Sequence, residues 1–298
     1  TKYEFGKDTT RKPTVALPAA SGGGAGQVQL LDGTGWHTAD MRADWRPDGV
    51  KRGHDVAFGY HYDQHTLNDR TYTNADWLAG NATTVNAGNT GKTETQGFYV
   101  QDAIQMGQDM KLTLGVRQEQ WRAFSGTTTN STPTTVAYPE RKENFTSPKL
   151  SLSWVATEDW LLRGSLSRAV RFPTVTELFQ GSISGTSIIN NDPGLKPEKI
   201  LASELAAERD LGGAGNLRIS LFQDDVTDYL TRQTDTTVFP TVTNIQNVDK
   251  VRVQGVETSM QRRDAFMQGL DLTGSVTFAD SEILANTKNP ASVGKEMI

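Results

Sequence analysis

The four histidines are the side chains of this sequence most able to do chemistry. His61 and His65 share one face of a predicted strand, but four strand residues hold them about 13 Å apart. That separation is too long for both rings to bind one metal ion. His37 and His54 could meet only if their strands paired, so we predict no metal site.

The serine and glycine runs do not match catalytic motifs. Residues 181–185 read Gly-Ser-Ile-Ser-Gly, with isoleucine at the position where a nucleophile turn needs serine. The glycine-rich run at 22–26 is followed by no Lys-Ser or Lys-Thr pair and opens no helix, so it is not a phosphate loop. We therefore expect no catalytic residue, no cofactor and no enzymatic activity.

Strands of alternating polarity account for most of the chain. The run at 109–121 carries four apolar residues on one face, namely Met110, Leu112, Leu114 and Val116. Similar runs occur at 149–155, from 160, at 217–221 and at 270–278. Residues 199–210 have helical propensity, but Pro197 before them and a Gly-Gly pair after them favour a strand. A short helix is predicted at 174–180.

Tight turns and long polar stretches alternate along the chain. Turns are predicted near 46–51, 106–109, 156–159, 211–215 and 263–267, and loops near 9–33, 68–91, 125–141, 172–196, 232–248 and 281–298. In an up-and-down meander every second connection lies at the same end, so the loops share one rim. Short periplasmic turns and long extracellular loops are typical of outer-membrane barrels. We predict an all-β fold, an antiparallel up-and-down transmembrane β-barrel, partial, with about twelve strands. Tryptophans near strand ends would suit its interfacial girdles, namely Trp36, Trp45, Trp121 and Trp160.

Composition agrees with such a barrel. Hydrophobic residues make up 36% of the 298 residues, and the mean hydropathy is −0.51, which suits a wall with a polar lumen. No apolar run is long enough for a transmembrane helix, but a barrel strand needs only about 9–11 residues. A net charge of −5 argues against nucleic-acid binding, and the lack of cysteine excludes a disulfide scaffold. The alternative reading of the alternation is an antiparallel sandwich, although several runs of roughly 12–18 residues exceed typical sandwich strands.

Three segments, in this order, resemble a TonB-dependent outer-membrane receptor. Residues 167–179 resemble the Arg-x-Pro-Thr…Glu-Leu-Phe segment, 192–198 the Asn-Pro-x-Leu-Lys-Pro-Glu segment, and 247–257 the strand ending in Gly-Val-Glu. Asp192 stands where asparagine is more usual. We expect these motifs mainly to build the wall. Gly255 would allow a close backbone approach, and Arg171 and Glu257 would face the lumen or a rim because they are costly against lipid.

The resemblance implies a 22-stranded barrel plugged by an N-terminal domain. Residues 1–298 would then be one partial barrel domain, an internal piece without the plug or the TonB box. It implies a place in the outer membrane of a Gram-negative bacterium, in contact with its lipid. It also implies that a TonB complex engages the missing N-terminal region and that the protein imports a scarce ligand, with a ferric siderophore or another iron complex as the first candidate. Such a piece would leave two unpaired sheet edges.

Arginine and aromatic residues of the loops are the candidate ligand contacts, because such side chains suit anionic, ring-bearing iron chelates. They are Arg70, Tyr72, Trp77, Tyr138, Arg141, Arg171 and Phe179. A passive porin is the alternative function. An outer-membrane hydrolase or a soluble β-rich carbohydrate-binding protein is a further one. The sequence leaves the ligand open among siderophore, haem, cobalamin, nickel and sugar.

Overall fold

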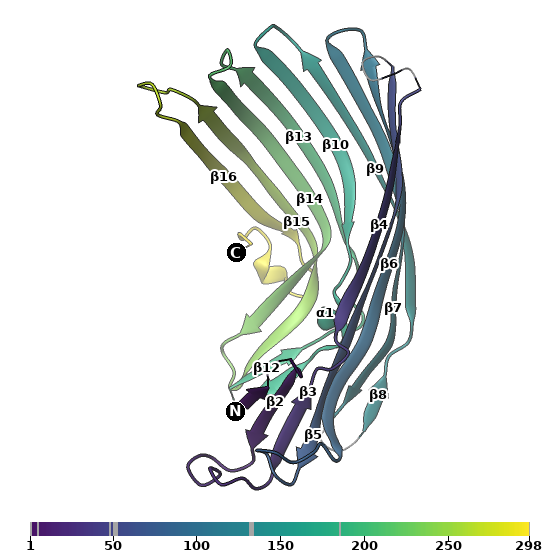
Figure 1. The fold of residues 1–298 in the computed structure, drawn as a ribbon, viewed down its shortest axis with the longest axis vertical. Coiled ribbons are helices and arrows are strands. Elements are labelled where there is room, and N and C mark those ends of the chain that lie inside the picture. Colours follow the sequence, from purple (N-terminus) through teal and green to yellow (C-terminus); the bar gives the residue numbers. More distant parts are fainter. Residues whose placement is uncertain are drawn as a thin grey trace.

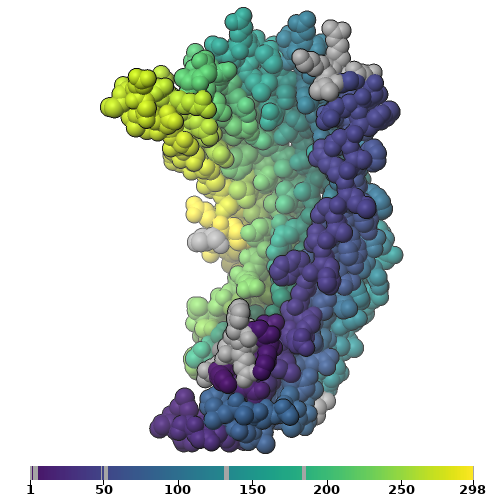
Figure 2. All heavy atoms as spheres, viewed as in Figure 1, coloured from purple at the N-terminus to yellow at the C-terminus, as the bar shows by residue number. Residues whose placement is uncertain are grey.

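A computed structural model describes residues 2–4, 6–47, 49, 53–130, 134–184 and 186–297. Its strands lie side by side in one curved, antiparallel wall with short turns at one end and longer connections at the other (Figure 1). The space-filling view shows the wall hollowed between its N-terminal and C-terminal strands (Figure 2). None of the helices in the described residues has the length and apolar character to cross a membrane. The predicted fold class is confirmed.

The long strands follow one another around the wall in sequence order. They are β4 (Gly35–Trp45), β5 (His54–Asn74), β6 (Val85–Met106), β7 (Met110–Thr129), β9 (Arg141–Val155), β10 (Trp160–Arg171), β13 (Glu198–Asp210), β14 (Gly215–Asp235), β15 (Thr241–Arg262) and β16 (Leu272–Ala285). Residues 199–210, with their helical propensity, do form a strand, because β13 pairs along its whole length with β10 and β14. Within the described chain β4 pairs only with β5.

Short elements crowd the loop end. β1 (Lys2–Glu4), β2 (Thr9–Pro13) and β3 (Gly26–Leu30) extend the sheet beside β5, and β8 (Thr135–Ala137) pairs with β7. Between β10 and β13 the chain forms α1 (Val175–Phe179), as predicted, then β11 (Ser182–Ser184) and β12 (Ser187–Asn190). β12 pairs in parallel with β15. The short 3-10 helix η1 (Pro290–Ser292) precedes a C-terminal segment that returns to β16.

The two faces of the wall differ in polarity, as the alternation predicts. Leucines of one face are exposed, with Leu150 at 45% and Leu205 at 65%. The other face bears α1, which lies within the curve of the wall (Figure 1). We call these the convex and concave faces. Arg171 and Glu257 fall on the concave face, in phase with their neighbours' polar residues. A convex apolar face is what contact with lipid requires.

The predicted loops are mostly too long. β5 runs to Asn74, β6 begins at Val85, and β14 and β15 leave only residues 236–240 between them. These strand ends carry polar residues on both faces, so their sequence predicts a loop. The backbone hydrogen bonds between the strands nevertheless continue beyond the apolar belt. The turn between β15 and β16 is longer than predicted, spanning 263–271. Part of the predicted turn at 46–51 lies outside the described residues.

Trp121 does not belong to an interfacial girdle, so this prediction was wrong. Its side chain is 1% exposed and packs beneath α1 on the concave face. Trp45 lies on the convex face near the turn end, where such a girdle belongs. The prediction for Gly255 is confirmed, because a Cβ there would collide with the Phe278 carbonyl oxygen and the Phe222 ring.

Candidate functional site at the loop end of the wall

A capping box starts α1 immediately after β10. Thr174 Oγ1 accepts from the Glu177 backbone N–H at 3.2 Å, and Glu177 Oε2 accepts from the Thr174 N–H at 2.8 Å. Arg171 Nη2 donates to Glu177 Oε1 at 2.8 Å. Burial alone would raise the pKa of Glu177, but the Thr174 N–H and the Arg171 guanidinium outweigh it and lower that pKa. These contacts fix the start of the connecting segment.

Phe179 anchors the other end of α1 to the wall. Its side chain is 3% exposed, and a Cβ built on Gly91 or on Gly126 would overlap its ring. Tyr138 stacks on Phe179 with ring centroids 5.8 Å apart. The surrounding apolar cluster joins β5, β7, α1, β14 and β15 through Leu67, Trp121, Ala123, Val175, Leu178, Leu195, Leu230 and Ile245. The space that Gly91 and Gly126 leave open thus receives the Phe179 ring of the loop.

Arg141 holds the segment that follows β12. Its Nη1 donates to the carbonyl oxygens of Pro193 and Leu195 at 2.8 and 2.7 Å, and its Nη2 donates to Glu143 Oε1 at 2.6 Å. The guanidinium lies 5.2 Å from the Trp121 ring centroid. One cation therefore serves as donor to two backbone carbonyls, one of them that of Leu195, a fully buried residue.

Trp77 belongs to a separate lobe. It is 6% exposed, and its Nε1 donates to the Ala20 carbonyl oxygen at 2.9 Å. It thereby joins the connection after β2 to the one after β5. Arg70 and Tyr72 lie on the face of β5 opposite Leu67, by strand alternation, and so point away from α1.

The structure therefore gathers four of the seven candidate contacts around α1, namely Tyr138, Arg141, Arg171 and Phe179. It does not bring Arg70, Tyr72 or Trp77 into that group. Each of the four contacts another residue of the protein. Their role in binding a ligand stays a prediction.

A chain of histidine and aspartate on the concave face escaped the sequence analysis. His61 Nδ1 lies 2.6 Å from Asp40 Oδ1, and its Nε2 lies 3.2 Å from Asp63 Oδ2. Asp63 Oδ1 lies 3.2 Å from His65 Nδ1. Ionised carboxylates only accept hydrogen bonds, so His61 can donate to Asp40 and Asp63 together when both of its ring nitrogens carry a proton.

The sequence signal for this histidine–aspartate cluster is Asp63, which lies midway between the two histidines. His61 and His65 are too far apart to share a metal ion, but Asp63 sits between them on the same face and contacts both. Asp40 joins only because the pairing of β4 with β5 sets it directly opposite His61. In the described part of the chain no three His, Asp or Glu side chains are placed to hold a metal.

Three cations on the concave face of β7, β9 and β10 form a basic strip, which we define as Lys111, Lys149 and Arg163. Lys111, Ser153 and Arg163 make one row across the strands, while Gly115, Lys149 and Ser167 make another two rows further on. Hydroxyls of Thr113, Ser151 and Ser165 lie between the rows. A hollow of about 410 Å³ is lined by the three cations and these hydroxyls, and no Asp or Glu of the described residues lines it.

The strip differs from the other arginines nearby. Arg117 pairs with Glu119, Arg141 with Glu143 and Arg171 with Glu177. Within the described residues none of the three strip cations has an acidic partner in an ion pair; Arg163 Nε instead donates to Ser153 Oγ at 3.3 Å. Uncompensated positive charge with hydroxyl donors attracts oxyanions.

An apolar convex face, a polar concave face and loops gathered at one end define the wall of an outer-membrane β-barrel. The family model described as TonB dependent receptor-like, beta-barrel matches residues 3–297. The chain therefore belongs to the TonB-dependent receptor family, whose members are Gram-negative outer-membrane proteins.

Solved structures show the same fold. The copper transporter OprC gives a TM-score of 0.64 at 16% identity, over 88% of this chain and 39% of that chain. The ferric citrate transporter FecA gives 0.60 at 18% identity, over 91% and 38%. The ferric-catecholate import receptor Fiu from K12 E. coli gives 0.60 at 17% identity, over 91% and 40%.

One curated relative matches part of the sequence. It is an iron-regulated outer membrane virulence protein of Vibrio cholerae serotype O1, 25% identical over 147 residues, which cover 46% of this chain and 22% of the relative. The chain thus spans about two fifths of the solved neighbours' length. The matched family and these neighbours are receptors and transporters, not enzymes.

Proposed function

We propose that the protein containing this chain binds a ferric siderophore or another iron complex at the loop end and imports it, energised by TonB. Family membership supports receptor-mediated import. The relative from Vibrio cholerae is iron-regulated, and two of the neighbours named above carry ferric ligands. The copper neighbour shows that the fold alone does not select the metal.

The observation that carries the ligand class is the basic strip, which lies on the concave face nearer the turn end, along the path that an imported ligand would take after the loops. Lys111, Lys149 and Arg163 face the lumen and have no acidic partner among the described residues, and no carboxylate lines their hollow in that part of the chain. Iron chelates whose oxygens carry negative charge fit such a surface, and a cationic or neutral solute does not benefit from it. The rest of the barrel, the plug and the TonB box would belong to other parts of the parent protein.

The test is iron uptake in the native bacterium after deletion of the full-length gene. Cells starved of iron receive radiolabelled iron as hydroxamate, catecholate or carboxylate chelates. Uptake of one chelate is expected to fall in the deletion strain and to return with the intact gene. It should stay low when the returned gene lacks the TonB-contacting segment or when the proton gradient is collapsed.

Two results would contradict the proposal. Unchanged uptake of every chelate would show that the protein does not import these iron complexes. Uptake that persists without the TonB-contacting segment would favour the passive porin.

A further inference from the structure

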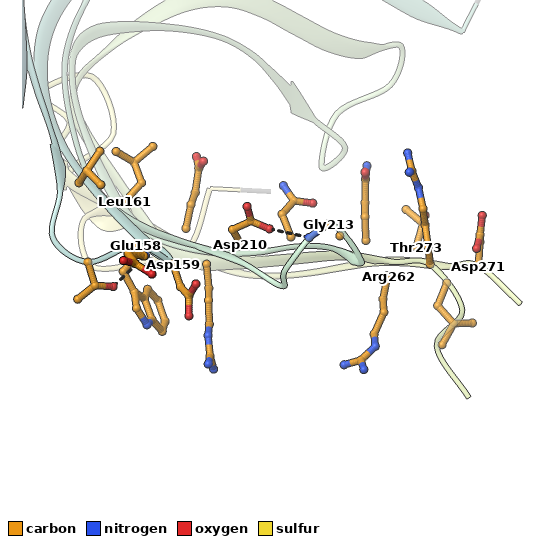
Figure 3. A pocket seen from close by; sticks show the side chains of 18 residues that line it. Glu158, Asp159, Leu161, Asp210, Gly213, Arg262, Asp271 and Thr273 are labelled. Atoms are coloured by element: carbon orange, nitrogen blue, oxygen red, sulfur yellow. Dashed lines mark hydrogen bonds between the residues drawn. The ribbon is translucent and has the colours of Figure 1, made fainter. Parts of the chain in front are cut away.

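A hollow of about 650 Å³ lies at the turn end of the wall, far from α1, where β10, β13, β14, β15 and β16 begin or end. Figure 3 shows its lining, with Leu161 and Asp271 on one side of the ribbon and Arg262 on the other. We call the part on the convex side the rim groove and define it by Trp160, Arg209, Gly215, Arg262 and Leu272. These residues come from five neighbouring strands.

Strand alternation places the rim groove on the lipid-facing surface. Arg209 is in phase with Leu205, and Arg262 with Met260, both of which are exposed on the convex face. Trp160 pairs directly with Arg209, and Arg262 with Gly215 and Leu272. The groove therefore continues into the apolar belt through Leu217 and Ile219 of β14. Its position is the edge of that belt nearest the turns.

Two guanidinium groups flank a gap in this surface. β13 and β15 are separated by β14, and Arg209 and Arg262 are offset by two residues along the strands, so their backbones stand about 12 Å apart. The residue of β14 opposite Arg262 is Gly215, which has no side chain to fill the space. Arg209 lies 5.6 Å from the Trp160 ring centroid. Tryptophan at this depth is typical of a membrane–water interface.

Arg209 and Arg262 form no ion pair with a carboxylate of the described residues. On the concave side Arg218 is held by Glu204 and Glu208. No ion pair joins Arg209 or Arg262 to any carboxylate among the described residues, although acidic residues line the same hollow. Two exposed guanidiniums next to lipid thus keep their donors for a ligand.

The acidic residues of the hollow fall into two groups. Glu208 binds Arg218, Asp210 Oδ1 accepts from the Gly212 N–H at 3.0 Å, and Asp271 Oδ1 accepts from the Asp264 N–H at 3.3 Å. Glu158 and Asp159, in the turn beside Trp160, are exposed. The groove consequently offers cations on its floor and carboxylates at its edge.

We propose that the rim groove binds the head group of a membrane phospholipid with an ammonium beside its phosphate, as in phosphatidylethanolamine. Arg209 and Arg262 donate to the phosphate oxygens, which guanidinium geometry suits. Glu158 and Asp159 accept from the ammonium, and the acyl chains lie along Leu217 and Ile219. Continuity with the lipid-facing belt favours a lipid over free phosphate, whose binding would use none of that apolar surface. The site does not depend on the imported ligand.

The test uses native mass spectrometry of the full-length protein released from detergent. Short-chain phosphatidylethanolamine, phosphatidylglycerol, phosphatidylcholine and inorganic phosphate are titrated separately. We expect the ethanolamine lipid to bind with the highest affinity. Replacing both arginines, Arg209→Gln with Arg262→Gln, should weaken its binding by about tenfold or more, the effect of losing one charged hydrogen bond.

A matched control removes the same charges elsewhere on the convex face. Lys142→Gln with Arg168→Gln changes one exposed cation on β9 and one on β10, away from the groove. A second variant, Glu158→Gln with Asp159→Asn, changes only an exposed turn and should reduce the preference for ethanolamine over glycerol lipid. Equal loss in the control, unchanged lipid binding in the arginine variant, or binding of phosphate as tight as that of lipid would each overturn the proposal.

Discussion

The ring of Phe179 occupies the space that a side chain on Gly91 would need. A side chain on Gly126 of β7 would overlap the same ring. Tyr138 stacks on Phe179 with ring centroids 5.8 Å apart. The segment between β10 and β13 is therefore held to the wall by one inserted aromatic ring. An insertion that depends on a missing side chain is sensitive to a single methyl group.

Gly91→Ala is expected to expel Phe179 and release α1 from the wall. Overpacking at such a site costs about 1–3 kcal/mol. Limited proteolysis of the full-length protein should then cut near residues 179–191. Gly164→Ala is the control, because its Cβ would meet Leu205 only at 3.4 Å. Equal cleavage of both variants would show that the insertion does not hold the loop.

Arg141→Gln should free the segment around Pro193 and Leu195. Both carbonyl oxygens lose their charged donor, and hydrogen bonds of that kind contribute about 1.5–3 kcal/mol. Hydrogen exchange of residues 191–197 should accelerate. Lys142→Gln, on the other face of the same strand, should leave exchange unchanged. Arg141→Lys should restore part of the protection, since an ammonium can still donate to one carbonyl; no acceleration in Arg141→Gln would contradict the anchoring role.

Acid should loosen α1 through Glu177. The pKa of this carboxyl is lowered in the folded state, so its contribution to stability is complete above its unfolded pKa, about 4.3. That contribution is lost as the pH falls through the lower folded value. Proteolytic cleavage near α1 should therefore rise below about pH 4. In Glu177→Gln cleavage should already be raised at neutral pH and depend less on acid; an unchanged pH profile in that variant would rule out Glu177 as the source.

His61 is expected to donate from both ring nitrogens, to Asp40 and to Asp63. Imidazole nitrogen chemical shifts of labelled histidine in the full-length protein would show this directly. Asp63→Asn replaces one acceptor with an amide that can donate, so the doubly protonated signal of His61 should weaken, and that of His65 should also move. His37, whose ring has no hydrogen bond or ion pair among the described residues, is the internal reference. A neutral His61 in the unmodified protein would contradict the hydrogen-bond assignment.

The faces of the wall were predictable because lipid on one side and water on the other impose a period of two. Leu150 and Lys149 fall on opposite faces for that reason alone. The helix at α1 was predictable as well, since Thr174 and Glu177 carry its capping signal in the sequence.

Register was not predictable, and the site depends on it. Nothing in the spacing of Asp40 and His61 shows that they face each other; that follows from the pairing of β4 with β5. Trp121 was misplaced because a tryptophan near a strand end fits a girdle or a core equally well, and α1 decides between them. The strand ends beyond the belt were predicted as loop because no apolar face marks them.

Loss of the basic strip should weaken uptake without weakening the barrel. In Lys111→Gln with Lys149→Gln and Arg163→Gln, the concave face loses three positive charges that no described carboxylate compensates. The chelate concentration for half-maximal uptake should therefore rise several-fold, and more strongly at low salt, because screening shortens the reach of the lost charges. Urea unfolding in vesicles should change little, because exposed lysines contribute little to stability. The pair Lys142→Gln with Arg168→Gln changes charge on the opposite face and should leave uptake unaltered. If that pair slows uptake as much as the strip variant does, the net charge of the wall governs import and the placement of the strip does not.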